Sequence, residues 1–201
     1  MSDSLDGLFL IGGSIIMGLA LPISAIQILF VNFFSDSFPA IAFAFDEGVD
    51  HLGHQPRKLS KNILDARIKF LVLAIGATTS ALLFVIYWFM LKLNLPVDLV
   101  QTFIFATFAT YTLLVSFSLR SLRKSIFRYN PFSNLYLVGG VLTGIGLTAM
   151  AVYYPFMQKI LGTVSLPLGW IYGVIGIGIL NILAVEFGKW IFNKFNTDAS
   201  I

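Results

Sequence analysis

The sequence predicts an all-α, polytopic membrane protein: a bundle of six transmembrane helices with both termini on the cytoplasmic side. Of its 201 residues, 57% are hydrophobic and only 11% are charged, whereas globular domains average roughly 25% charged residues. The apolar residues gather in six stretches, each about long enough to cross the hydrocarbon core of a bilayer. Basic residues gather in alternate connections between these stretches, as the positive-inside rule requires.

The apolar stretches set the expected boundaries of the six helices. The first is the shortest, and its glycines Gly12, Gly13 and Gly18 make it weak as an isolated helix. The expected spans are about 5–21, 23–45, 70–91, 99–119, 135–154 and 168–192. We expect residues 1–201 to form one membrane domain without a separate soluble domain.

The distribution of Lys and Arg predicts the orientation. Two of the 13 basic residues, Lys92 and Lys159, fall on one side of the predicted bundle. The other 11 fall on the opposite side: Arg57, Lys58, Lys61, Arg67, Lys69, Arg120, Arg123, Lys124, Arg128, Lys189 and Lys194. We therefore expect that side to be cytoplasmic, with the protein in the plasma membrane.

The second span carries polar residues at its middle, where a carboxylate costs at least ~2.5–3.5 kcal/mol to insert. Asn32 and Asp36 are four residues apart and so share one helix face, with Ser35 beside them. Pro39 lacks an amide hydrogen and its ring crowds the carbonyl of Ser35, so the helix should kink or open. Freed carbonyls, an amide and a carboxylate together form an all-oxygen site for a hard cation. The alternative is that the helix ends near Ser35 and these residues form an interfacial cap.

Other polar residues have simpler interpretations. His51 and His54 stand among acidic residues, but nearby glycines favour a solvated loop over a metal site. Glu186 precedes Lys189 by three residues, which favours an ion pair at the interface over a role in transport. The basic run 120–128 is typical of a positive-inside anchor, and it could also bind anionic lipid headgroups.

Small and hydroxylated residues predict how the spans pack. Gly140 and Gly144, like Gly169 and Gly173, are four residues apart, a spacing that lets helices approach closely. The fourth span is rich in hydroxyl groups, which can bond back to their own helix and so indicate a polar pathway only weakly. They are Thr102, Thr107, Thr110, Thr112, Ser116 and Ser118.

Several catalytic signatures are absent from the sequence. There is no glycine-rich phosphate loop, no Asp-Lys-Thr-Gly motif and no cysteine. We expect no resident cofactor, no nucleic-acid partner and no ATP hydrolysis by this chain alone.

The residues from Leu21 onward read LPISAIQILFVNFFSDSFPAIAFAFD, which closely resembles the sixth-helix region of calcium-pump-like P-type cation-transporting ATPases. Later segments are similar to the family in the same order: QPRK, TFIFATFATYTLLVSFSLRSLRKSIF, NPFSNLYLVGGVL and YYPFMQKILGTVSLPLGW. The resemblance covers about Asp3 to Asn193 and implies that the six spans are the family's helices five to ten.

The resemblance also implies a site. Asn32 and Asp36, with Ser35 where the family often has Thr, would be ligands of a transported cation: calcium, another divalent ion or a proton. Gly7 stands where calcium-pump-like members usually carry a glutamate, and Thr112 stands where some carry an acid. Asp36 would thus be the one carboxylate left of three.

The function expected from this resemblance is that of the C-terminal membrane module of a P-type cation-transporting ATPase. The module would contribute part of the cation site, with the fifth helix cut short at Met1. Its expected partners are the lipid bilayer and the missing N-terminal and cytoplasmic domains, supplied on another chain. The alternatives are a stand-alone membrane scaffold or accessory subunit, a small passive carrier or channel, and a truncated remnant without transport activity.

Overall fold

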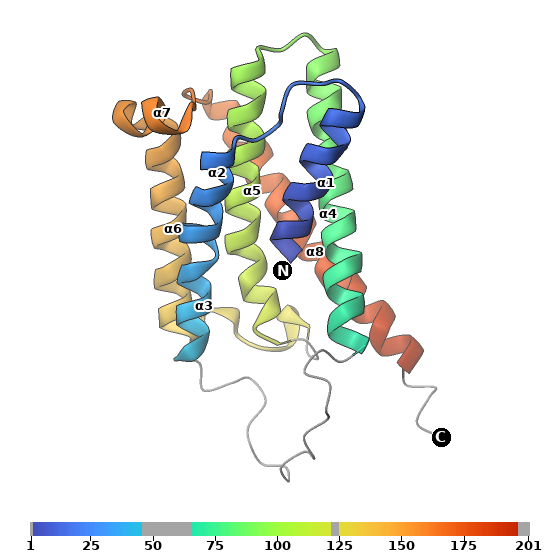
Figure 1. Cartoon of the computed structure of the whole chain (residues 1–201). Helices are drawn as coiled ribbons and strands as arrows, with labels where there is room; N and C mark the ends of the chain where they lie inside the picture. Colours follow the sequence, from blue (N-terminus) through green and yellow to red (C-terminus); the bar gives the residue numbers. More distant parts are fainter. Residues whose placement is uncertain (1, 46–65, 122–124, 197–201) are drawn as a thin grey trace.

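The computed structural model describes residues 2–45, 66–121 and 125–196, and within them every regular element is a helix (Figure 1). This confirms the all-helical prediction. The elements are α1 (Ser2–Ile16), α2 (Ala25–Phe30), the π-helical turn η1 (Val31–Ser35), α3 (Ser37–Ala44), α4 (Ala66–Lys92), α5 (Val97–Leu119), the short 3-10 turns η2 (Ile126–Arg128) and η3 (Pro131–Ser133), α6 (Leu135–Tyr153), α7 (Pro155–Leu161) and α8 (Leu168–Asn196).

Four helical stretches in the described part of the chain are long and apolar enough to cross a membrane. They are Ala25–Ala44, Val97–Leu119, Leu135–Tyr153 and Leu168–Ile191. Two shorter apolar helical stretches accompany them, Gly7–Ile16 and Gly76–Lys92. The chain is therefore a multi-pass helical membrane protein.

Helix α5 forms the centre of the bundle and is the most buried of the four long helices (Figure 1). It packs against α4, α6, α8 and η1. Its side chains Ile104, Phe105 and Leu113 are fully buried, and the Phe105 ring meets Phe30 edge-on at 5.5 Å between centroids. Its central position comes from contacts with elements on several sides and not from an all-apolar surface, since it carries six threonine and serine residues.

Several hydroxyl groups of α5 bond to their own helix, as the sequence indicated. Thr102 and Thr112 donate to the carbonyls of Asp98 and Phe108, four residues earlier in each case. Ser116 donates to a carbonyl three residues earlier. Each of these three hydroxyls is therefore satisfied by a carbonyl of its own helix.

The first helix ends at Ile16, five residues before the predicted end of the first span. Gly18 adopts the left-handed conformation, with φ of 64°. Its amide donates to the carbonyl of Ile15, and the amide of Leu19 donates to that of Ser14. This pair of bonds is a Schellman motif, which closes a helix at a glycine without steric cost.

Three of the four glycines predicted to let α6 and α8 pack closely lie at tight contacts. A Cβ added to Gly140 would lie 3.2 Å from the backbone oxygen of Phe38 on α3, and one added to Gly173 would lie 3.2 Å from the Phe103 ring. At Gly144 the nearest atom belongs to Leu113. Gly169 has nothing within 4 Å of an added Cβ.

Gly144→Ala is expected to lower the free energy of unfolding by ~1–3 kcal/mol, the usual cost of overpacking. The added Cβ would lie 2.5 Å from Cδ2 of Leu113, so that side chain would have to leave its packed position. Gly146→Ala on the same helix is the control, because nothing lies within 4 Å of its added Cβ. Thermal unfolding of the purified chain in detergent measures both, and equal melting curves would contradict this packing argument.

Candidate cation site at the broken helix

The second long helix is interrupted at its middle by the π-helical turn η1, which links α2 to α3 (Figure 1). The amide of Asp36 donates to the carbonyl of Val31, five residues earlier, at 3.2 Å. Pro39 removes the amide that an α-helix would offer to the carbonyl of Ser35. Single π-helical turns within α-helices are frequent at functional sites. The opening predicted from Pro39 is therefore present, and the helix continues to Ala44 instead of ending near Ser35.

The three predicted ligands differ in how deeply they are buried. Ser35 is fully buried and Asp36 is partly buried at the junction of η1 and α3. Asn32 lies on the exposed surface of the described chain. The polar groups of the turn therefore extend from the interior of the bundle to its exposed surface.

Two buried hydroxyl oxygens have no hydrogen-bond partner among the described residues: those of Ser35 and Thr107. Thr107 lies on α5, which packs against η1. Buried polar atoms are nearly always paired, so such an oxygen calls for water or an ion as its partner. The sequence pointed to Thr107 only as one of many hydroxyls on its helix, because nothing local distinguishes it from those that bond back to their own backbone.

The two positions where the resemblance expected further acids offer no second carboxylate. Gly7 lies on α1 and borders a small space lined by apolar side chains of Leu10, Ile23, Leu83 and Phe108. Thr112 donates to its own helix. Among the described residues, no three His, Cys, Asp or Glu side chains cluster as a metal site would need. Cation binding at η1 would therefore rest on Asp36 with neutral oxygens.

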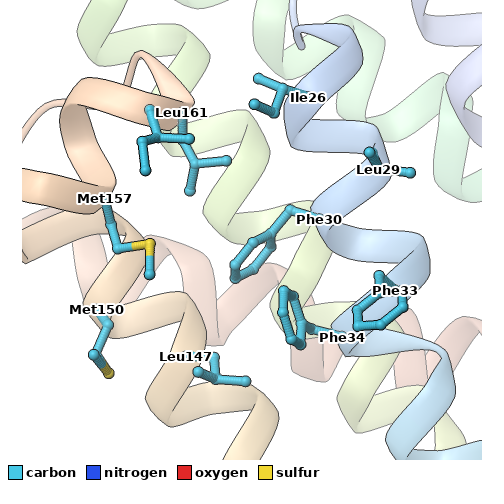
Figure 2. Close-up of a pocket in the computed structure, with 10 residues that line it drawn as sticks. Ile26, Leu29, Phe30, Phe33, Phe34, Leu147, Met150, Met157 and Leu161 are labelled. Atoms are coloured by element: carbon cyan, nitrogen blue, oxygen red, sulfur yellow. The ribbon is translucent and has the colours of Figure 1, made fainter.

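The broken helix also borders an apolar groove of about 360 Å³, which Figure 2 shows between this helix and α6 and α7. Phe30, Phe33 and Phe34 line one wall. Leu147 and Met150 line part of the other. Every lining side chain is apolar, so the groove offers no oxygen to replace the water around a cation. We exclude it from the cation site.

A second polar cluster joins α5 to α8, well away in sequence from η1. Lys189 and Glu186 form the predicted ion pair, with 2.7 Å between Nζ and Oε1. The pair is buried, which differs from the interfacial position expected. The ammonium of Lys189 also donates to the carbonyl of Ser118 at 2.6 Å and to its hydroxyl at 2.9 Å. The hydroxyl of Ser118 donates to Glu186 in turn, and the amide of Ile126 donates to the other carboxylate oxygen.

This cluster is fully paired and therefore suits a structural role. The ammonium has three acceptors, and the carboxylate receives hydrogen bonds at both oxygens. Burial of the Glu186–Lys189 pair is favoured because Lys189 donates to a carbonyl in the last turn of α5. The carbonyls of a last turn have no donor within their own helix. His51 and His54, the other candidate ligands considered from sequence, lie outside the described residues.

Comparisons with known proteins agree with a helical membrane domain. A family model described as "Cation transporting ATPase, C-terminus" matches residues 20–191. The chain is 35% identical over 161 residues to a calcium-transporting ATPase of Bacillus subtilis, covering 78% of this chain and 18% of that protein. It is 30% identical over 171 residues to calcium-transporting ATPase 1 of Bacillus cereus, covering 77% and 19%. It is 29% identical over 169 residues to human calcium-transporting ATPase type 2C member 1, covering 83% and 18%.

These observations define the class of protein: it is a multi-pass helical bundle in which a polar π-helical turn interrupts one span. The chain belongs to the family of cation-transporting ATPase C-terminal domains, and its relatives include calcium-transporting P-type ATPases. It spans 18–19% of the length of the relatives named above.

Proposed function

We propose that this chain is the C-terminal membrane part of a P-type cation-transporting ATPase and contributes Asn32, Ser35 and Asp36 to the intramembrane cation site. The observation that carries the proposal is the π-helical turn with an acid, a buried unpaired hydroxyl and an amide at mid-span. An acid at this depth is costly unless it faces a partner, a cavity or an ion. The ion is a hard cation, calcium or another divalent ion, or a proton.

The exposed position of Asn32 supports an incomplete site. An amide facing hydrocarbon loses its hydrogen bonds to water, yet Asn32 is exposed beside Phe33, which is 64% exposed. A further membrane helix, supplied by the remainder of a longer pump or by another chain, would cover this face and complete the ligand set. The actuator, phosphorylation and nucleotide-binding domains would come from the same source.

We also propose the membrane arrangement that the basic residues favour. The two shorter apolar helices would cross the bilayer with the four long ones, giving six spans and cytoplasmic termini in the plasma membrane. Lys159 on α7 and Lys92 at the end of α4 would then face the outside. Labelling of a single cysteine introduced at Lys159 in intact cells, compared with one at Ser133, tests this orientation.

The test of the cation site is a titration of thermal stability. The purified chain, and the chain co-expressed with the remaining pump domains where they exist, should melt at a higher temperature as the transported cation is added. Calcium, magnesium, manganese and protons are compared separately. The DNA upstream of the Met1 codon identifies the source of the other domains: an adjoining frame with Asp-Lys-Thr-Gly supports a divided pump.

A second candidate function is a membrane scaffold or accessory subunit that binds no ion. The apolar surroundings of Gly7 and the lack of a clustered set of acids in the described part of the chain favour it. Melting curves that do not respond to any of the four cations, together with a stoichiometric partner that lacks catalytic domains, would establish this function in place of the first.

A further inference from the structure

The connection between α5 and α6 forms a rigid turn over residues 125–134 at the end of the bundle where α5 ends (Figure 1). It lies beside the end of α3, as the hydrogen bond from the side-chain amide of Asn134 to the carbonyl of Ala42 shows. Two short 3-10 turns, η2 and η3, make up most of it. The turn therefore lies where the bundle leaves the apolar part of the membrane.

Hydrogen bonds fix this turn from several sides. The amide of Ile126 donates to Glu186 at 3.1 Å, and the hydroxyl of Tyr129 donates to the carbonyl of Phe117 at 2.7 Å. Arg120 donates to the carbonyl of Asn130 and to the hydroxyl of Ser133. The backbone of the turn is thus held in place before any partner binds.

The exposed side chains of the turn include two aromatic rings and a basic group. Phe127 is 78% exposed and Phe132 is 61% exposed, and the exposed Arg128 stands next to Phe127. The guanidinium of Arg128 forms no hydrogen bond or ion pair with any residue that the structure describes. Two exposed phenylalanines and an exposed arginine on one turn are unfavourable in water but suit the boundary between headgroups and acyl chains.

We propose that this turn binds an anionic phospholipid of the adjacent leaflet, with Arg128 on the phosphate and Phe127 and Phe132 inserted beside the acyl chains. A guanidinium pairs with phosphate through two parallel hydrogen bonds. Charge complementarity selects an anionic lipid over a zwitterionic one. The prior rigidity of the turn lowers the entropy lost on binding. A general positive-inside anchor acts through charge count during insertion and needs neither the fixed turn nor the exposed rings.

The proposal is tested by melting the full chain in detergent micelles supplemented with phosphatidylglycerol or with phosphatidylcholine of the same acyl chains. The wild type should be stabilised more by phosphatidylglycerol. Arg128→Gln should bind phosphatidylglycerol about fivefold more weakly, the ratio that corresponds to the ~1 kcal/mol typical of one basic residue at an anionic surface. Its melting in phosphatidylcholine should equal that of the wild type, which also verifies that the variant is folded.

Helix α7, at the other end of the bundle in Figure 1, provides matched controls. Lys159→Gln removes one exposed positive charge, and Phe156→Ser removes a ring that is 61% exposed. Neither should change the preference for phosphatidylglycerol, whereas Phe127→Ser should reduce binding of this lipid. An equal loss in Arg128→Gln and Lys159→Gln would mean that net charge alone attracts the lipid and would overturn the proposal. A wild type stabilised equally by both lipids would overturn it as well.

Discussion

Asp36→Asn is expected to abolish the cation-dependent part of the thermal stability. At a cation concentration of about 100 times Kd, binding to the folded state adds ≈ 2.7 kcal/mol to the free energy of unfolding. For a chain of this size that raises the melting temperature by roughly 5–10 °C. The asparagine keeps the shape and one oxygen of the ligand but removes the charge. The turn Val31–Ser35 carries no other carboxylate to replace it, and the resemblance implies the other two acids at positions that Gly7 and Thr112 occupy here.

The control for this variant is Asp98→Asn. Asp98 is exposed in the first turn of α5, so its replacement removes the same charge without touching η1. That variant should keep the full response of the wild type to calcium, magnesium, manganese and pH. If Asp36→Asn keeps the response too, Asp36 is no ligand and the site must be sought elsewhere in the chain.

Lys189→Met is expected to lower the free energy of unfolding by ~3–5 kcal/mol, the cost of leaving one member of a buried ion pair uncompensated. Glu186 would remain buried, with Ser118 and Ile126 still donating to it but without its counter-charge. Thermal unfolding in detergent measures the loss. The double variant Glu186→Gln/Lys189→Met should recover most of it, because a neutral pair of similar volume has no unpaired charge to bury.

Lys159→Met is the matched control for the loss of a lysine. Its side chain is exposed on α7, so its replacement should change stability by no more than ~0.5 kcal/mol. If Lys189→Met melts like Lys159→Met, the ammonium of Lys189 is solvated in the native protein and the buried cluster is not a stabilising contact.

Properties that depend on neighbouring residues could be predicted from the sequence alone. The apolar stretches predicted where helices lie, and four of these helices in the described part of the chain are long and apolar enough to cross a membrane, because transfer of a helix into the bilayer depends on its own side chains. Pro39 predicted the break in the second long helix, since the missing amide acts within one turn of the chain. The early end of α1 at Gly18 was not predicted. A boundary drawn from hydropathy does not detect a glycine that ends a helix through a capping motif.

The tertiary structure decided which polar groups are buried. Asn32, Ser35 and Asp36 lie within one stretch of sequence, but only packing against α5 separates the buried hydroxyl of Ser35 from the exposed amide of Asn32. The spacing of Glu186 and Lys189 predicted an ion pair, yet Ser118, its third member, is 68 and 71 residues away. Periodicity within one helix shows which residues share a face. Which other helix covers that face depends on contacts between distant segments, and these form only when the bundle is assembled.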